Sequence, residues 1–138
     1  MTFLLDVSAL LALLWETHDF NERVTRWQEN QSLAVCPITE LGFLRISTQP
    51  SFGLSPAEAR RVLNEWKRVR KPIFVACDLT PLDGDEPPGS GQTTDFYLAA
   101  LAEKHGMAWA TLDGGVKHRA LFLIPPTSLD LPSAGEPA

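Results

Sequence analysis

The chain has 138 residues, the size of one domain, and 44% of them are hydrophobic, which is enough to form a core. Charged residues make up 21% of the sequence, close to the globular average, which excludes a largely disordered chain. The formal net charge of −5 is the opposite of the balance expected for a protein that coats nucleic acid. Cys36 and Cys77 lie in apolar runs without metal-type spacing and are predicted to be reduced core residues, with a single disulfide as the alternative.

The N-terminal residues 3–15 form an apolar run that superficially matches the core of a signal peptide. The run has no basic head, Asp6 interrupts it, and it is too short to cross a bilayer. The sequence therefore predicts a soluble cytoplasmic domain with no membrane contact.

Apolar and amphipathic segments alternate over the first half of the chain. The predicted elements are a fully buried strand at 3–5, helices at 8–15 and 20–29, a strand at 33–36, and two helices capped by Thr39 and Ser55, the second ending before Pro72. The last of these helices has the strongest start, because its serine cap is followed by Pro56 and Glu58. Its apolar stripe is predicted to consist of Ala59, Val62, Leu63, Trp66 and Val69.

The second half continues the alternation around one irregular segment. Further strands are predicted at 73–77, 107–112 and 120–124, together with a helix that is capped by Thr94 and ends at His105. Residues 81–91, rich in Pro, Gly and Asp, predict a mobile loop. This pattern is typical of an α/β domain with a mostly parallel sheet flanked by helices. We assign residues 1–125 to that domain and residues 126–138 to a flexible C-terminal tail.

Four acidic residues fall where predicted strands end or predicted helices begin. Asp6 and Asp113 directly follow apolar strands, whereas Glu40 and Asp95 lie in first helical turns. In an open α/β sheet these positions gather at one edge, where ligands bind. Helical spacing places Glu40 and Asp95 on apolar faces, so both are expected to point inward with no Lys or Arg nearby. Inward carboxylates without cationic partners must raise their pKa or bind a metal.

Each of these acids also has a simpler explanation when it is taken alone. The helix dipole favours an acid in a first turn, and Asp6 can cap the helix that begins at Ser8. Four acids that converge on one edge are harder to explain in this way, and an oxygen-rich cluster favours Mg²⁺ or Mn²⁺. The histidines are scattered and are expected at the surface rather than in a zinc site: His18, His105 and His118.

The four acids lie in the segments LLDVSALLALLW, ITELGFLRI and TTDFYLAALAEKHGMAWATLD. In combination these segments resemble the acidic blocks of PIN-domain ribonucleases, specifically the VapC-type toxins of toxin–antitoxin modules, over about residues 2–125. The resemblance implies a PIN-like fold and a site for Mg²⁺ or Mn²⁺ formed by Asp6, Glu40, Asp95 and Asp113. It also implies an RNA substrate, a cognate antitoxin that blocks the cleft, and a homodimer. The loop at 81–91 departs from the family pattern.

Two hydroxyl residues match polar positions of the same family. Ser8 lies two residues after the first acid and Thr111 two residues before the last. Both are expected to orient the carboxylates or their bound waters. Helix capping by Ser8 and a half-buried strand position for Thr111 explain them equally well.

Basic residues offer candidate contacts for an RNA backbone. Arg45, on the same predicted helix as Glu40, is the preferred candidate for a phosphate contact. One face of the helix after Ser55 carries Arg60, Lys67 and Lys71, next to expected ion pairs between Glu58 and Arg61 and between Glu65 and Arg68. We interpret that face as a solvated surface, with an RNA track as the alternative.

Hydrolysis of a phosphodiester needs an activated water, a polarised phosphorus and a stabilised leaving oxygen, and bound Mg²⁺ can supply all three without a protein nucleophile. Together with the resemblance to VapC-type ribonucleases, this chemistry makes metal-dependent RNA hydrolysis by a toxin the expected function. One alternative is a PIN-like interaction module without catalysis. The other is a phospho-accepting receiver domain, which is disfavoured because only Asp6 follows the first strand and Asp78 lacks a partner pattern.

Overall fold

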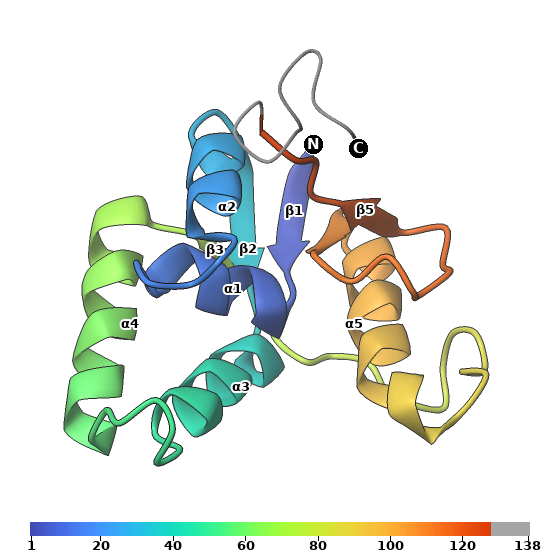
Figure 1. Cartoon of the computed structure of the whole chain (residues 1–138). Coiled ribbons are helices and arrows are strands. Elements are labelled where there is room, and N and C mark those ends of the chain that lie inside the picture. The colour runs from blue at the N-terminus through green and yellow to red at the C-terminus, as the bar shows by residue number, and fades with distance from the viewer. Residues whose placement is uncertain (128–138) are drawn as a thin grey trace, which may run out of the picture.

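The computed structural model describes residues 1–127, which form a parallel five-stranded sheet in the order β3-β2-β1-β4-β5 (Figure 1). The strands are β1 (Thr2–Leu5), β2 (Ser32–Val35), β3 (Ile73–Phe74), β4 (Ala108–Thr111) and β5 (Leu121–Leu123). The central strand β1 pairs with β2 through Phe3 and Leu33, and with β4 through Phe3 and Ala108. The expected α/β fold with a parallel sheet is confirmed.

Helices cover both faces of this sheet, and the strands are apolar on both sides for that reason. The helices are α1 (Val7–Leu14), α2 (Asn21–Gln28), α3 (Pro37–Ser47), α4 (Pro56–Arg70) and α5 (Thr93–Lys104), the last preceded by the 3-10 turn η1 (Ser90–Gln92). Phe3 and Leu5 pack into a cluster with side chains of α1 to α4, whereas Leu4 packs with α5 and Trp109. The side chains of β1 thus alternate between two cores.

Three helices begin earlier than the sequence predicts. Helix α1 begins at Val7, because Asp6 is its cap. Helix α3 is capped by Cys36 and begins at Pro37, so Thr39 lies inside the first turn, where its hydroxyl donates to the Leu5 carbonyl at 2.8 Å. Helix α5 is capped by Gln92 rather than by Thr94. The predicted caps at Thr39 and Thr94 are therefore wrong, because proline in one case and the preceding 3-10 turn in the other start the helix first.

The sheet edge at β3 is shorter and more exposed than predicted. The strand spans Ile73–Phe74 instead of residues 73–77, and both side chains are about half exposed. The Val75 amide still donates to the Val35 carbonyl at 2.8 Å, but the ladder ends there. The chain then leaves the sheet, so Cys77 is exposed whereas Cys36 is buried, and both are free thiols. The prediction of two core cysteines is correct for Cys36 only.

Helix α4 begins as predicted, with a capping box in which Ser55 and Glu58 exchange hydrogen bonds. Its apolar stripe is narrower than predicted. Ala59 and Leu63 are buried, whereas 37% of Val62 and 65% of Val69 are exposed.

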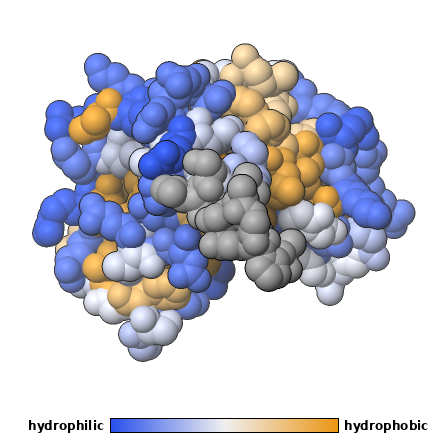
Figure 2. Space-filling model, turned by 45° about the horizontal axis from the view of Figure 1, so that its top comes forward, coloured by the Kyte–Doolittle hydropathy of each residue, from blue (hydrophilic) through white to orange (hydrophobic). Residues whose placement is uncertain are grey.

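The face of the molecule in Figure 2 is mostly hydrophilic, with apolar side chains gathered in separate areas.

Residues 128–138, which make up nearly all of the predicted C-terminal tail, lie outside the described residues. Within the described part of the chain, no helix has the length and apolar character needed to cross a membrane.

A glycine in α3 allows this helix to pack closely against the start of α1. A Cβ atom at Gly42 would lie 2.5 Å from a methyl carbon of Val7, the residue that follows Asp6. We expect Gly42→Ala to destabilise the protein by about 1–3 kcal/mol through overpacking, although alanine in a helix normally gains about 1 kcal/mol. Urea unfolding measures this change.

The matched variant is Gly42→Ala combined with Val7→Ala, which removes the two methyl carbons that clash. The free energy of unfolding should recover when Val7→Ala is added to Gly42→Ala, and the coupling between the two changes should be favourable. A single Gly42→Ala variant that is as stable as the wild type would show that the two helices can separate without cost.

Candidate active site

Asp6 is held rigidly at the junction between β1 and α1. Its residue surface is 8% exposed. One carboxylate oxygen accepts from the Val7 amide at 2.7 Å, and the other accepts from the hydroxyls of Thr111 at 2.8 Å and Ser8 at 3.2 Å. Burial raises the pKa of Asp6 above its ordinary value, because its effect is larger than that of the hydrogen bonds, which lower the pKa. Asp6 therefore caps α1 and also presents a desolvated carboxylate.

The Thr111 hydroxyl links the acids at the ends of the neighbouring strands β1 and β4. Thr111 is fully buried at the end of β4. Its oxygen donates to Asp6 at 2.8 Å and accepts from the Asp113 amide at 3.0 Å. Asp113 itself is exposed, and its Oδ1 accepts from the Gly115 amide at 2.8 Å. One side chain thus sets the relative position of Asp6 and the Asp113 backbone.

Asp95 enters the same site from the first turn of α5. Its pKa is raised from 3.8 to about 6, first by burial and then by the negative charges of Asp6 and Asp113. Three of the four predicted acids therefore lie close enough to repel one another. The hydrogen bonds that hold Asp6 and Asp113 come from hydroxyls and backbone amides, which leave this negative charge uncompensated.

Glu40 has a cationic partner, contrary to the sequence-based expectation. Its Oε2 lies 2.8 Å from the Nζ of Lys67, which reaches across from α4. The two side chains are only 18% and 33% exposed. Glu40 lines a groove of about 560 Å³ between α3 and α4, whose other polar walls are Arg60, Arg61, Asn64 and Lys67. The expectation that all four acids lack a cation is wrong for Glu40, because α4 packs beside α3.

Arg45 is exposed and lines a neighbouring hollow together with Arg60. It therefore lies on the α3–α4 side of the molecule, and no contact places it against Asp6 or Asp95 within residues 1–127. Of the two predicted ion pairs on α4, the one between Glu65 and Arg68 is present at 2.7 Å. Glu58 instead serves mainly as the capping partner of Ser55.

The histidines do not contribute to the acidic site, but the surface position predicted for His118 is wrong. Only 1% of its side chain is exposed. The ring meets Phe96 edge to face at 5.3 Å, and its Nδ1 accepts from the Ala120 amide at 3.0 Å. His105 instead pairs with Asp78 at 2.9 Å. Sequence patterns gave no signal for the burial of His118, because it follows from contacts with α5.

Carboxylate chemistry at this site fits a hard divalent cation. Within residues 1–127, no three His, Cys, Asp or Glu side chains are grouped closely enough to form a ready-made metal cage. Mg²⁺ does not need such a cage, because it is usually held by one or two carboxylates and keeps several waters or substrate oxygens. The desolvated Asp6 and the neighbouring Asp95 and Asp113 meet that requirement.

The sequence also matches known proteins over most of its length. The family model described as PIN domain matches residues 3–120. Ribonuclease VapC38 of Mycobacterium tuberculosis is 41% identical over 121 residues, which cover 82% of this chain and 86% of the relative. Ribonucleases VapC44 and VapC29 of the same species are 36% and 32% identical over 135 residues, covering 91% and 93% of this chain and 93% and 100% of the relatives. The chain therefore belongs to the PIN domain family and is a member of its VapC type.

Proposed function

We propose that this protein is a toxin ribonuclease that hydrolyses RNA phosphodiester bonds with Mg²⁺ or Mn²⁺ held at the acidic site. The observation that carries the proposal is the meeting of Asp6, Asp95 and Asp113, where burial and then the charges of Asp6 and Asp113 raise the pKa of Asp95 to about 6. Such repulsion weakens the fold unless a cation offsets it. The ribonuclease names of the VapC relatives support the same activity and make a non-catalytic interaction module the weaker alternative.

Each acid has a proposed role in binding the metal. Asp6 and Asp95 are the direct ligands, because one is fixed at a strand end and the other at a helix start. Asp113 and Glu40 complete the site directly or through water, and Glu40 does so with the oxygen that Lys67 leaves available. When bound, the ion supplies an activated water, a polarised phosphorus and a stabilised leaving oxygen.

The hydroxyls of Ser8 and Thr111 are positioning groups in this proposal. Both donate to the same oxygen of Asp6, so they fix the direction in which its remaining lone pairs point. Thr111 also fixes the backbone of Asp113. Groups of this kind orient metal ligands and keep them deprotonated.

The RNA backbone is proposed to follow the basic side of the molecule next to the acids. Arg45 and Arg60 line one hollow, and Arg60, Arg61 and Lys67 line the adjoining groove that contains Glu40. These cations favour phosphate binding despite the net charge of −5. Arg45, which is on α3 and takes no part in the ion pairs of α4, is the proposed phosphate contact.

The family also supports proposals about partners and location. We propose a cognate antitoxin protein that covers the acidic site, a homodimer, and a cytoplasmic location, as is typical of toxin–antitoxin modules. The acidic site is a suitable target for such inhibition, because a cationic side chain placed there would replace the metal and relieve the repulsion among the three aspartates.

The experiment that tests the activity uses the purified protein and end-labelled single-stranded RNA. We expect cleavage with Mg²⁺ or Mn²⁺, none after addition of EDTA, and recovery when Mn²⁺ is added in excess. Cleavage that persists in EDTA would contradict the metal mechanism. A folded protein that cuts no RNA with either ion would favour the interaction module.

A further inference from the structure

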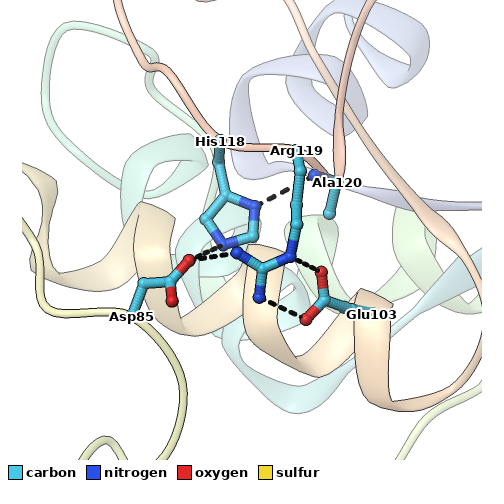
Figure 3. A network of polar contacts seen from close by, with 5 residues as sticks. All are labelled: Asp85, Glu103, His118, Arg119 and Ala120. Carbon is cyan, nitrogen blue, oxygen red and sulfur yellow. Dashed lines mark hydrogen bonds and ion pairs between the residues drawn. The ribbon is translucent and has the colours of Figure 1, made fainter.

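The loop at residues 81–91 is anchored to the body of the protein by one arginine (Figure 3). The guanidinium of Arg119 binds Asp85 of this loop and also donates to Glu103 of α5 at 2.6 Å. The Nε2 of His118 lies 3.5 Å from the same Asp85 oxygen, and its Nδ1 accepts from the Ala120 amide at 3.0 Å. The segment between β4 and β5 therefore fixes the position of the loop.

The anchored loop forms one wall of a cavity beside the acidic site. This cavity has a volume of about 360 Å³ and is lined by Glu86, Pro88, Gln92, Phe96, Gly115 and Lys117. Phe96 directly follows Asp95 in α5, and the Gly115 amide binds Asp113. Two residues that line the cavity are thus direct neighbours of proposed metal ligands, Phe96 in sequence and Gly115 through a hydrogen bond.

The walls of the cavity have the chemistry of a nucleotide site. Phe96 and Pro88 offer apolar surface to a flat base, and the Gln92 amide can both donate to and accept from a base edge. Lys117 is exposed and can hold a phosphate next to that base. A volume of this size lies near the lower end of the range for small-ligand sites, about 300–1,000 Å³, which suits one nucleotide.

We propose that this cavity receives the base of the nucleotide next to the scissile phosphate, so that the enzyme cuts single-stranded RNA with a preference for one base at that position. Gln92 reads the base, Lys117 holds its phosphate, and Arg119 acts as a positioning residue by fixing the loop. This inference rests on the proposed ribonuclease function and adds the determinant of its specificity.

The first test compares the wild type with Gln92→Leu on four RNAs that differ only in the nucleotide beside the cut. The wild type should prefer one base by about 10-fold or more in kcat/KM, as expected for an amide–base hydrogen-bonded pair. Gln92→Leu should reduce this preference to about 3-fold or less. Gln49→Leu makes the same chemical change at an exposed loop residue and should keep the preference. An unchanged preference in Gln92→Leu would overturn the proposal.

The second test uses Arg119→Ala, with Arg26→Ala as the matched control. Arg26 forms an ion pair with Glu22 that is as exposed as the pair between Arg119 and Asp85. Arg119→Ala should lower the base preference by at least about 3-fold, whereas Arg26→Ala should not change it. An equal loss of rate on all four RNAs in Arg119→Ala would show that the loop does not select the base.

A binding measurement separates failure of this inference from failure of the proposed function. If the wild type cuts no RNA with Mg²⁺ or Mn²⁺, the ribonuclease proposal fails. The role of the cavity is then tested by measuring the affinities of the four labelled RNAs by fluorescence anisotropy in the presence of Ca²⁺. A base preference that Gln92→Leu removes supports the nucleotide site, and equal affinities for all four RNAs overturn it.

Discussion

Replacing Asp95 with asparagine is expected to lower kcat/KM for RNA cleavage by at least about 100-fold while the protein stays folded. Asparagine has nearly the same size and keeps the first turn of α5, but it removes a negative oxygen from the proposed metal site. Loss of a residue that merely orients a ligand already costs about 10–100-fold, so loss of a ligand should cost more. Cleavage assays with saturating Mn²⁺, together with circular dichroism, measure both effects.

The same variant should be more stable than the wild type at pH 7 when no metal is present. The pKa of Asp95 is raised to about 6 in the folded protein, so the folded state binds this proton more tightly than the unfolded state. The contribution of Asp95 to stability therefore falls as the pH rises from about 4 to about 6, and it stays unfavourable above that range. The difference in Tm between variant and wild type should be positive at pH 7 and vanish near pH 4.

Asp19→Asn is the matched control, since Asp19 is an exposed aspartate outside the acidic site. It should change neither activity nor the pH dependence of Tm. If Asp95 serves only the dipole of α5, Asp95→Asn will remain active and lose about 0.3–1 kcal/mol of stability. The metal-ligand role and the dipole role therefore predict opposite changes in both measurements.

The positions of the acids could be predicted from the sequence because each depends on local structure. Asp6 and Asp113 follow short apolar runs that predict buried strands, and parallel strands bring such ends to one sheet edge. Asp95 lies in the first turn of a helix that covers the same edge. The fold class follows from the same alternation of strands and helices.

Other features of the site depend on packing between distant segments, which local patterns do not encode. Lys67 meets Glu40 across 27 residues because α4 folds beside α3, and the periodicity of either helix alone does not predict this. Arg119 meets Asp85 across 34 residues for a similar reason. The burial of His118 against Phe96 belongs to the same class of long-range contacts. Local patterns therefore located the four acids but not the cation that pairs with Glu40 or the contacts of Arg119 and His118.

Thr111→Val is expected to have the second largest effect, about a 10–100-fold loss of activity. Valine has the shape of threonine but removes the hydroxyl that joins Asp6 to the amide of Asp113. Asp6 then loses the shorter of its two hydrogen bonds from hydroxyl groups, and the partly buried amide of Asp113 loses its acceptor. Leaving these groups unpaired should cost about 1–3 kcal/mol of stability. Urea unfolding and cleavage over a series of Mn²⁺ concentrations measure the two losses.

Thr39→Val separates a positioning role of Thr111 from a merely structural one. Thr39 is also fully buried, and its hydroxyl donates at 2.8 Å to the Leu5 carbonyl rather than to an acid. Both valine variants should lose stability, but only Thr111→Val should need more Mn²⁺ for half-maximal cleavage. Thr111→Ser keeps the hydroxyl and should restore the Mn²⁺ dependence of the wild type. If Thr111→Val and Thr39→Val respond to Mn²⁺ alike, the hydroxyl of Thr111 stabilises the fold and does not orient Asp6 toward the metal.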